Sequence, residues 1–130
     1  AINQLKNLNK VIKKRNKNAK ILDKLLSNKI PKIKIPERIK GHTETFALYM
    51  GLFKSRDKLI NYLFKRNIEC KIHYPIPLHL QKAATKLGYR KGSMPNAEYQ
   101  AKHLMTIPVH QFLNEKHMQY VAKNIIDFYS

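Results

Sequence analysis

Residues 45–53 are TFALYMGLF, a stretch in which apolar side chains occupy both alternating faces of an extended chain. A strand that is apolar on both faces is usually covered on both, so we predict that this stretch is the central strand of a sheet. Ser55 follows at a position where its hydroxyl can cap a helix, and the apolar face of residues 59–64 predicts that helix.

Downstream of this helix, residues 68–74 alternate apolar and polar side chains, which predicts a strand with one buried face. Residues 78–87 predict a short helix, and Pro95 suits the first turn of another helix. Residues 105–109 are expected to form a short extended segment, and a last amphipathic helix is expected from Asn114 onward. We therefore expect an α+β domain, in which a small, mainly antiparallel sheet of about three strands carries helices packed on it.

The N-terminal part of the chain predicts a long helix over residues 1–27. Apolar residues recur there at steps of three, four or seven, and only Arg15 interrupts the stripe. Such a helix runs roughly 40 Å, which exceeds what one small domain needs, so we expect it to bridge two bodies. The pattern is already under way at Ala1 and no capping residue precedes it, so we expect the chain to begin in mid-helix. Residues 28–43 are expected to be a linker, because their prolines disfavour a helix.

The charge of the chain is strongly positive, with 26 Lys and Arg against 8 Asp and Glu and a net charge of +18. This surplus would attract polyanions, and a free-standing basic module that binds nucleic acid or another polyanion through residues 6–40 is one alternative function. However, 21 of the 26 basic residues are lysines, and Lys, Asn and Ile share A/T-rich codons. Phosphate and base recognition more often uses Arg. Codon bias is therefore the favoured explanation, and nucleic acid is not an expected partner.

We expect this chain to contain no membrane span, no export signal and no catalytic residue. No apolar run approaches a bilayer span, and a single cysteine, Cys70, fits a reducing cytoplasm. The eight acids are scattered singly, Cys70 lies on the core side of a predicted strand, and the spacing of His73 and His79 matches no common metal site. We therefore predict no catalytic, metal-binding or cofactor-binding residue within the chain.

One segment remains as a candidate site, residues 72–79 with the sequence IHYPIPLH. Its polar and aromatic side chains stand at the end of a predicted strand beside a turn stiffened by prolines, and such strand ends are where sites tend to be built. Spacing alone also allows a structural interpretation, in which Tyr74 packs in the core with its hydroxyl at the rim and His73 lies on a polar face.

The same segment carries a resemblance to the C-terminal part of DegT-type aminotransferases. The order and spacing of several further segments resemble that family as well: Leu87-Gly88-Tyr89, Gly92, Pro95, Ala97-Glu98 and Ile107-Pro108-Val109-His110. The residues Ala1-Ile2, Gln4-Leu5, Leu8 and Arg15 resemble the helix that leaves the large domain of these enzymes. The resemblance covers essentially the whole chain, so residues 1–130 are expected to be the small C-terminal domain. Two departures are Ile107, where the family usually has Leu, and Ser93, where an acid is common.

The resemblance implies the chemistry of the parent enzyme. Members of the family are homodimers of fold type I that use pyridoxal 5'-phosphate to move an amino group, usually from glutamate, to a nucleotide-linked keto sugar. By the same resemblance, the small domain would close one side of the substrate cleft. His73 and Tyr74 would face the cleft and help bind the sugar nucleotide, and His79 is a third substrate-binding candidate.

The resemblance also implies what the chain lacks. No segment resembles the lysine motif of the large domain or the acid that pairs with the ring nitrogen of the cofactor. The chain alone is therefore expected not to transaminate, and whether it counts as an enzyme is left open. A further alternative is a split homologue whose apolar stripe, residues 5–26, docks on a separate large-domain chain.

Overall fold

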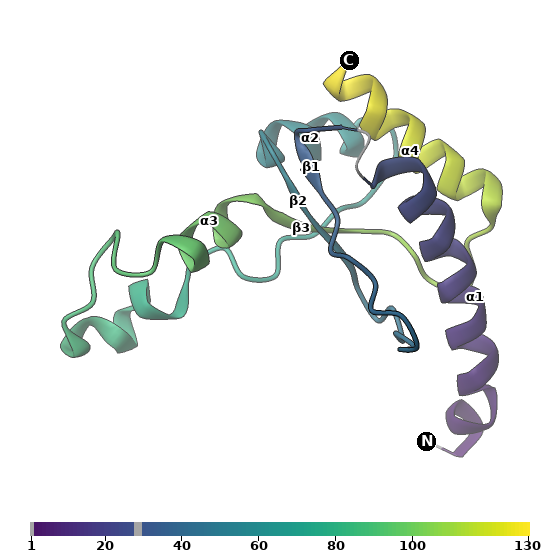
Figure 1. The fold of residues 1–130 in the computed structure, drawn as a ribbon, viewed down its shortest axis with the longest axis horizontal. Coiled ribbons are helices and arrows are strands. Elements are labelled where there is room, and N and C mark those ends of the chain that lie inside the picture. Colours follow the sequence, from purple (N-terminus) through teal and green to yellow (C-terminus); the bar gives the residue numbers. More distant parts are fainter. Residues whose placement is uncertain (1, 28–29) are drawn as a thin grey trace.

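A computed structural model describes residues 2–27 and 30–130, apart from the side chains of residues 3 and 4. A long N-terminal helix and the C-terminal helix lie side by side, and a small sheet packs against them (Figure 1). The helices, 3-10 turns and strands are, in chain order, α1 (Ile2–Leu26), β1 (Ile33–Lys34), β2 (Tyr49–Phe53), α2 (Arg56–Phe64), η1 (Leu78–Leu80), η2 (Lys82–Leu87), α3 (Pro95–His103), β3 (Leu104–Ile107) and α4 (Glu115–Tyr129).

The sheet has three strands in the order β1-β2-β3, and both neighbouring pairs are antiparallel. β2 lies at its centre and is buried on one face, where Tyr49 and Phe53 are almost fully buried. On its other face Met50 is 37% exposed, so the prediction that this strand is covered on both faces is wrong. Tyr49 pairs with Ile107 of β3, and Phe53 pairs with Ile33 of β1. This architecture confirms the predicted α+β class, with its antiparallel sheet and its long N-terminal helix.

Three strand predictions need correction. The central strand begins at Tyr49 rather than at residue 45, because Phe46 adopts a positive φ of 46° that no strand accommodates. Residues 68–74 form no regular strand; Lys71 makes a single bridge to Thr106, and the prolines that follow cannot donate further ladder hydrogen bonds. The third strand is instead β1, which lies within the predicted linker, residues 28–43, and forms one edge of the sheet. Of that linker, residues 28 and 29 lie outside the described residues, as does Ala1 of the predicted helix.

Two helix predictions also differ from the structure in detail. Residues 78–87 form two short 3-10 turns and not one α-helix. Ser55 stands at the N-cap position immediately before α2, but it has a left-handed backbone and its side chain makes no capping hydrogen bond. The last helix does begin as expected, since the Asn114 side chain accepts a hydrogen bond from the backbone N–H of His117.

The apolar stripe of α1 is buried along only half of the helix. Ala19, Leu22 and Leu26 are fully buried against the core, whereas Leu5 and Leu8 are 66% and 45% exposed. The helix therefore extends well beyond the body that it packs on, as Figure 1 shows at its N-terminal end. That it bridges to a second body stays a prediction. Among the described residues, no helix has the length and apolar character needed to cross a bilayer.

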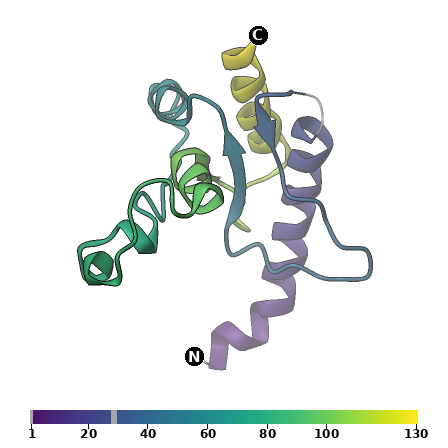
Figure 2. The same ribbon diagram turned by 60° about the vertical axis from the view of Figure 1, so that its left-hand side comes forward.

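Residues 75–103 project from the sheet as an arm, which contains η1, η2 and α3 (Figures 1 and 2). Only two side chains of the arm are buried, His79 and Ala101. Arg56 of α2 holds its base: this buried guanidinium donates hydrogen bonds to the carbonyl oxygens of Ala101 and Leu104, where α3 ends. The arm is thus firmly attached at one end and packs on little else in this chain.

Candidate functional site

His73 lies at the point where the chain leaves the sheet and enters the arm. Its Nε2 atom is 3.1 Å from Oγ1 of Thr106, a buried residue in β3. Thr106 is itself fixed by the backbone bridge to Lys71, where both N–H groups donate to the opposite carbonyl oxygen at 2.9 and 3.2 Å. The imidazole ring is therefore held at one nitrogen by the sheet, while the His73 side chain remains exposed to solvent.

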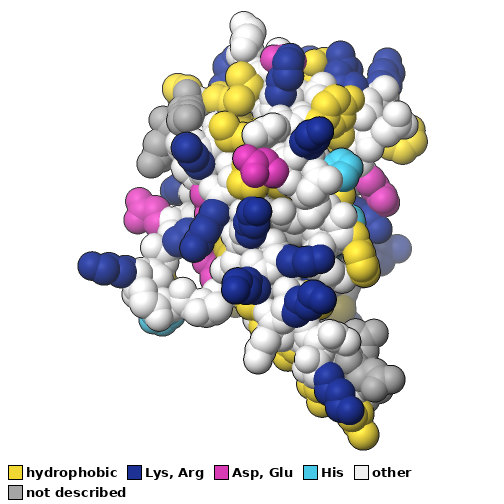
Figure 3. All heavy atoms as spheres, turned by 90° about the vertical axis from the view of Figure 1, so that its right-hand side faces the viewer, with side chains coloured by type: hydrophobic (Ala, Val, Ile, Leu, Met, Phe, Trp, Pro, Cys, Tyr) yellow, Lys and Arg dark blue, Asp and Glu magenta, His cyan; other side chains and the backbone are white. Residues whose placement is uncertain are grey.

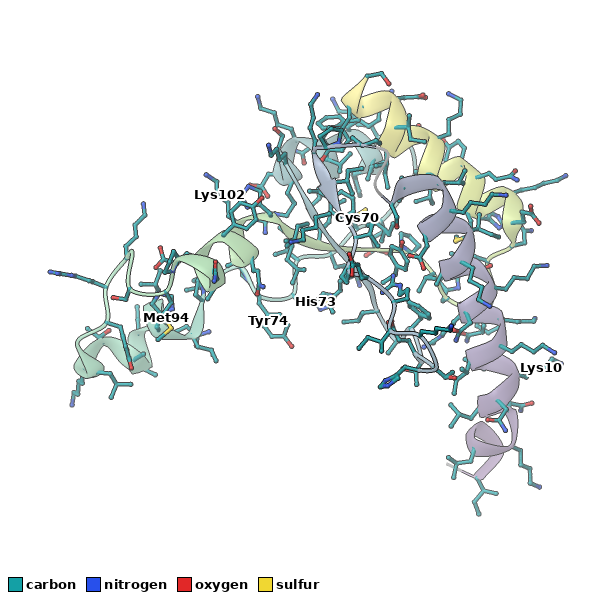
Figure 4. All side chains as sticks on the ribbon, in the orientation of Figure 1. Lys10, Cys70, His73, Tyr74, Met94 and Lys102 are labelled. Carbon is teal, nitrogen blue, oxygen red and sulfur yellow. The ribbon has the colours of Figure 1, made fainter. Side chains whose placement is uncertain are left out.

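Tyr74 lies beside His73, with the two ring centroids 6.4 Å apart. The Tyr74 side chain is 68% exposed, so it is not a core residue. Figure 4 shows it extending from the base of the arm, on the side away from α4. The structural alternative, in which Tyr74 packs in the core, is wrong, because the predicted strand that would have carried it inward does not form. An imidazole and a phenol are thus presented together at the surface.

His79 lies in a different environment, inside the arm. It is 8% exposed, and its Nε2 atom is 3.0 Å from Oε1 of Glu98 in α3. The same carboxylate oxygen accepts hydrogen bonds from the backbone N–H groups of Gly92 and Met94. The hydrogen bond from His79 is the main cause of a lowered pKa of Glu98. His79 therefore joins the start of the arm to its last helix, and its imidazole is already engaged.

A pocket of about 370 Å³ has Thr106, the hydrogen-bond partner of His73, in its lining. Thr106 and Lys71 line it together with residues of β2 and of the loop before α4, including Tyr49 and His110. Neither His73 nor Tyr74 is among its lining residues. Lys71 and Glu69 form an ion pair of 3.4 Å at its edge, so the pocket carries both signs of charge. Thr106 is the residue that connects this pocket to the His73 ring.

The sequence identified His73 and Tyr74 but not the residues that hold the site. Thr106 is not among the predicted site residues, although a polar residue within the apolar run of β3 is itself a signal. Arg56 gave no signal, because its partners are backbone carbonyl groups at the end of α3. Cys70 is half-buried, and burial raises the pKa of its thiol to about 12, which agrees with an unreactive structural cysteine.

The lysines that the structure describes do not fit the role of a Schiff-base residue for pyridoxal phosphate. Such a lysine is activated by burial or by a neighbouring cation, which lowers its pKa. Every lysine whose side chain the structure describes is exposed. Among the described residues there is also no group of three His, Cys, Asp or Glu side chains that could hold a metal ion. No step of cofactor chemistry is therefore derived from these residues.

Comparison with known proteins places this chain among the aminotransferases. The profile of the DegT/DnrJ/EryC1/StrS aminotransferase family matches residues 1–126. The chain belongs to this family. A pleiotropic regulatory protein of Geobacillus stearothermophilus is 32% identical over 123 residues, which are 94% of this chain and 33% of that protein. A dTDP-3-amino-3,6-dideoxy-alpha-D-galactopyranose transaminase of Aneurinibacillus thermoaerophilus is 27% identical over 97 residues, which are 75% of this chain and 26% of that protein.

Solved structures of the family share the fold. A DegT DnrJ EryC1 StrS aminotransferase of Brucella abortus superposes with a TM-score of 0.87 at 26% identity, over 99% of this chain and 34% of that one. DesV of S. venezuelae superposes with a TM-score of 0.89 at 24% identity, over 98% of this chain and 34% of that one. The chain thus spans about a third or less of the length of these relatives.

Proposed function

We propose that this chain is the small C-terminal domain of a pyridoxal-phosphate-dependent sugar aminotransferase and that it forms one side of the substrate cleft. Family membership supports the aminotransferase assignment, and the names of relatives such as the dTDP-amino-sugar transaminase of Aneurinibacillus thermoaerophilus support a nucleotide-linked sugar as the substrate. The cofactor, the glutamate donor and a homodimeric, cytoplasmic parent enzyme belong to the same proposal. The cofactor's Schiff base would be formed by a lysine outside this chain.

The observation that carries the proposed role is the pairing of His73 with Tyr74 at the base of the arm. Thr106 holds one nitrogen of the His73 ring, which leaves the other nitrogen free to bond a hydroxyl or phosphate group of a ligand. Tyr74 adds a phenol and an exposed aromatic face at 6.4 Å. Binding and orientation of a sugar nucleotide need such groups fixed in place, and neither residue needs to take part in the chemistry itself. His79 would contribute by holding the arm in shape.

The test is made in the full-length enzyme that contains this chain. His73→Gln should lower turnover of the sugar nucleotide by roughly 10- to 100-fold, because a misplaced substrate costs about that much. The urea unfolding midpoint should stay unchanged, since the His73 side chain is exposed. His42→Gln is the matched control, because His42 is an exposed histidine of the loop before β2. An unchanged rate in His73→Gln would remove this residue from the site.

The isolated chain is expected to transfer no amino group, because its described lysines are exposed and none fits a Schiff base. Incubation with pyridoxal phosphate, glutamate and a keto-sugar nucleotide should therefore give no 2-oxoglutarate above the cofactor-only background. Amino transfer by the isolated chain would contradict the proposal. Addition of a separately expressed large domain, followed by gel filtration, distinguishes this domain from a split homologue that assembles in trans.

A further inference from the structure

The outer face of α1 carries a continuous row of lysines, which we name the lysine stripe. Its members follow one another at steps of four, three, four, three and four residues and are all exposed: Lys6, Lys10, Lys13, Lys17, Lys20 and Lys24. At 3.6 residues per turn these steps keep all six side chains within a sector of roughly 80° and over a length of about 27 Å. Figure 3 shows basic side chains following this face, and Figure 4 shows Lys10 pointing away from the sheet.

The lysine stripe is not explained by amino-acid composition alone. Helix α1 also contains five asparagines, and Asn codons are as rich in A and T as Lys codons. If composition alone filled the polar positions, Asn and Lys would be mixed over the whole polar side. Instead, from Lys6 to Lys24 every residue of the outermost sector is a lysine, whereas Asn9 and Asn16 flank the stripe on one side and Asn7 on the other. The lysines are segregated onto the face farthest from the core.

This arrangement costs helix stability when no anion is present. Like charges three or four residues apart on a helix repel each other. The helix contains a single acid, Asp23, and its carboxylate is taken by Arg38, with which it forms an ion pair of 2.9 Å, and by the hydroxyl of Tyr49. There is also no acid in the first turn to offset the helix dipole. A linear polyanion laid along α1 would relieve this repulsion.

We propose that the lysine stripe is a binding surface for the phosphate backbone of nucleic acid, independent of base sequence. Lysines act as point charges toward phosphates, and such contacts position a protein on a duplex without reading its bases. Arg is the more frequent residue in phosphate and base recognition, but lysines also bind phosphates as point charges, which is the only contact that this surface requires. A stripe of about 27 Å spans about eight base-pair steps of a duplex, which are spaced by about 3.4 Å along its axis, so phosphates of both strands lie within its reach.

The residues beside the stripe favour nucleic acid over a membrane surface. A helix that lies on a membrane inserts apolar side chains that flank its basic residues. Here the flanking positions hold the polar residues Asn7, Asn9, Lys14 and Asn16 and one apolar residue, Ile21, which packs against the core. The apolar residues on the opposite side of the helix, Ala19, Leu22 and Leu26, are buried in the core. This proposal does not rest on the aminotransferase function proposed above.

The first experiment measures binding of the 130-residue chain to a fluorescein-labelled DNA duplex of about 20 base pairs by fluorescence polarisation over a range of salt concentrations. With about five phosphates neutralised, the logarithm of the binding constant should fall with the logarithm of salt concentration with a slope of roughly −4 to −5. A variant with all six stripe lysines changed to Gln should lose at least about 10-fold in affinity, and a variant with all six changed to Arg should retain it.

The matched control removes the same charge elsewhere. It changes six exposed lysines outside α1 to Gln and should bind within about 3-fold of the unchanged protein, because binding depends on the stripe and not on net charge alone. These residues are Lys40, Lys54, Lys58, Lys82, Lys86 and Lys91.

A protection experiment on the unsubstituted chain does not depend on whether the variants fold. Lysine acetylation followed by mass spectrometry should show the stripe protected by the duplex. Equal losses of affinity in the stripe variant and the control variant would overturn the proposal. Equal acetylation with and without DNA would also overturn it, as would tighter binding to phosphatidylserine vesicles than to the duplex.

Discussion

Cys70 shows how the surroundings of one residue decide its chemistry. Burial of the thiol, and secondly the charge of Glu69, raise its pKa to about 12. The reactive thiolate is then scarce near neutral pH. Alkylation by iodoacetamide at about pH 8 should therefore be at least about 100-fold slower in the folded chain than in guanidinium chloride, when followed by mass spectrometry. Equal rates in the two states would show that the thiol is neither buried nor shifted.

Thr106 is expected to act through His73, as a positioning residue. Thr106→Val removes the hydroxyl but keeps the shape of the side chain, so the His73 ring should lose its fixed orientation. In the full-length enzyme we expect a loss of turnover similar to that of His73→Gln, whereas Thr106→Ser should restore most of it. The NMR chemical shifts of the His73 ring protons should also move in Thr106→Val, because the ring loses its hydroxyl partner. A variant that leaves both readouts unchanged would contradict this role.

The candidate site could be predicted from the sequence only in part. His73 and Tyr74 were found because they stand in a short polar and aromatic run bounded by prolines. Thr106 is 33 residues from His73, and the hydrogen bond between them depends on the bridge that sets Lys71 against β3. Local spacing contains no information on such a bridge. The substrate roles of His73, Tyr74 and His79 stay predictions.

At the scale of one element, two substitutions in α1 test which part of its apolar stripe is buried. Leu22→Ala should lower the free energy of unfolding by about 2–5 kcal/mol, because Leu22 is fully buried. Leu5→Ala is the matched control in the same stripe; Leu5 is 66% exposed, and we expect a change within about 0.5 kcal/mol. Urea unfolding followed by circular dichroism measures both. Equal losses would mean that the N-terminal half of α1 is packed in the isolated chain.

The long helices of the fold were predictable from the sequence, and its strands were less so. α1 and α4 carry apolar stripes over 25 and 15 residues, so periodicity identifies them. Residues 68–74 show an equally clear alternation, yet only Lys71 pairs with the sheet. β1 has only two residues, and its place at the sheet edge is fixed by pairing with β2, 20 positions away for the Ile33–Phe53 pair. Such pairing is a tertiary effect that local patterns do not contain.

At the scale of the whole molecule, the arm should depend on pH through Glu98. The hydrogen bond from His79, and then those from Gly92 and Met94, lower the pKa of this carboxyl from its ordinary value of 4.5. The folded arm therefore binds the proton less readily than the unfolded chain does. This contribution to stability is present above about pH 4.5 and is lost as the pH falls through the lowered pKa.

Hydrogen–deuterium exchange of peptides from residues 75–103 measures this effect. Protection, corrected for the intrinsic exchange rate, should be lower at about pH 3 than at about pH 5.5, because the contribution of Glu98 is lost as the pH falls through its lowered pKa. Peptides from α4 serve as an internal reference. Glu98→Gln should show low protection in the arm at both pH values, and a pH response of the arm that survives this change would exclude Glu98 as its cause.

The sparse packing of the arm has a consequence for how this protein can evolve. Residues 75–103 bury only His79 and Ala101, while the core of the domain is formed by the sheet, α1, α2 and α4. Most substitutions in the arm therefore leave the stability of the fold intact, whereas substitutions in the core do not. Successive point mutations in the arm can therefore change which ligand it binds, while each variant in the series still folds. The arm is thus a surface that tolerates substitution, attached to a core that does not.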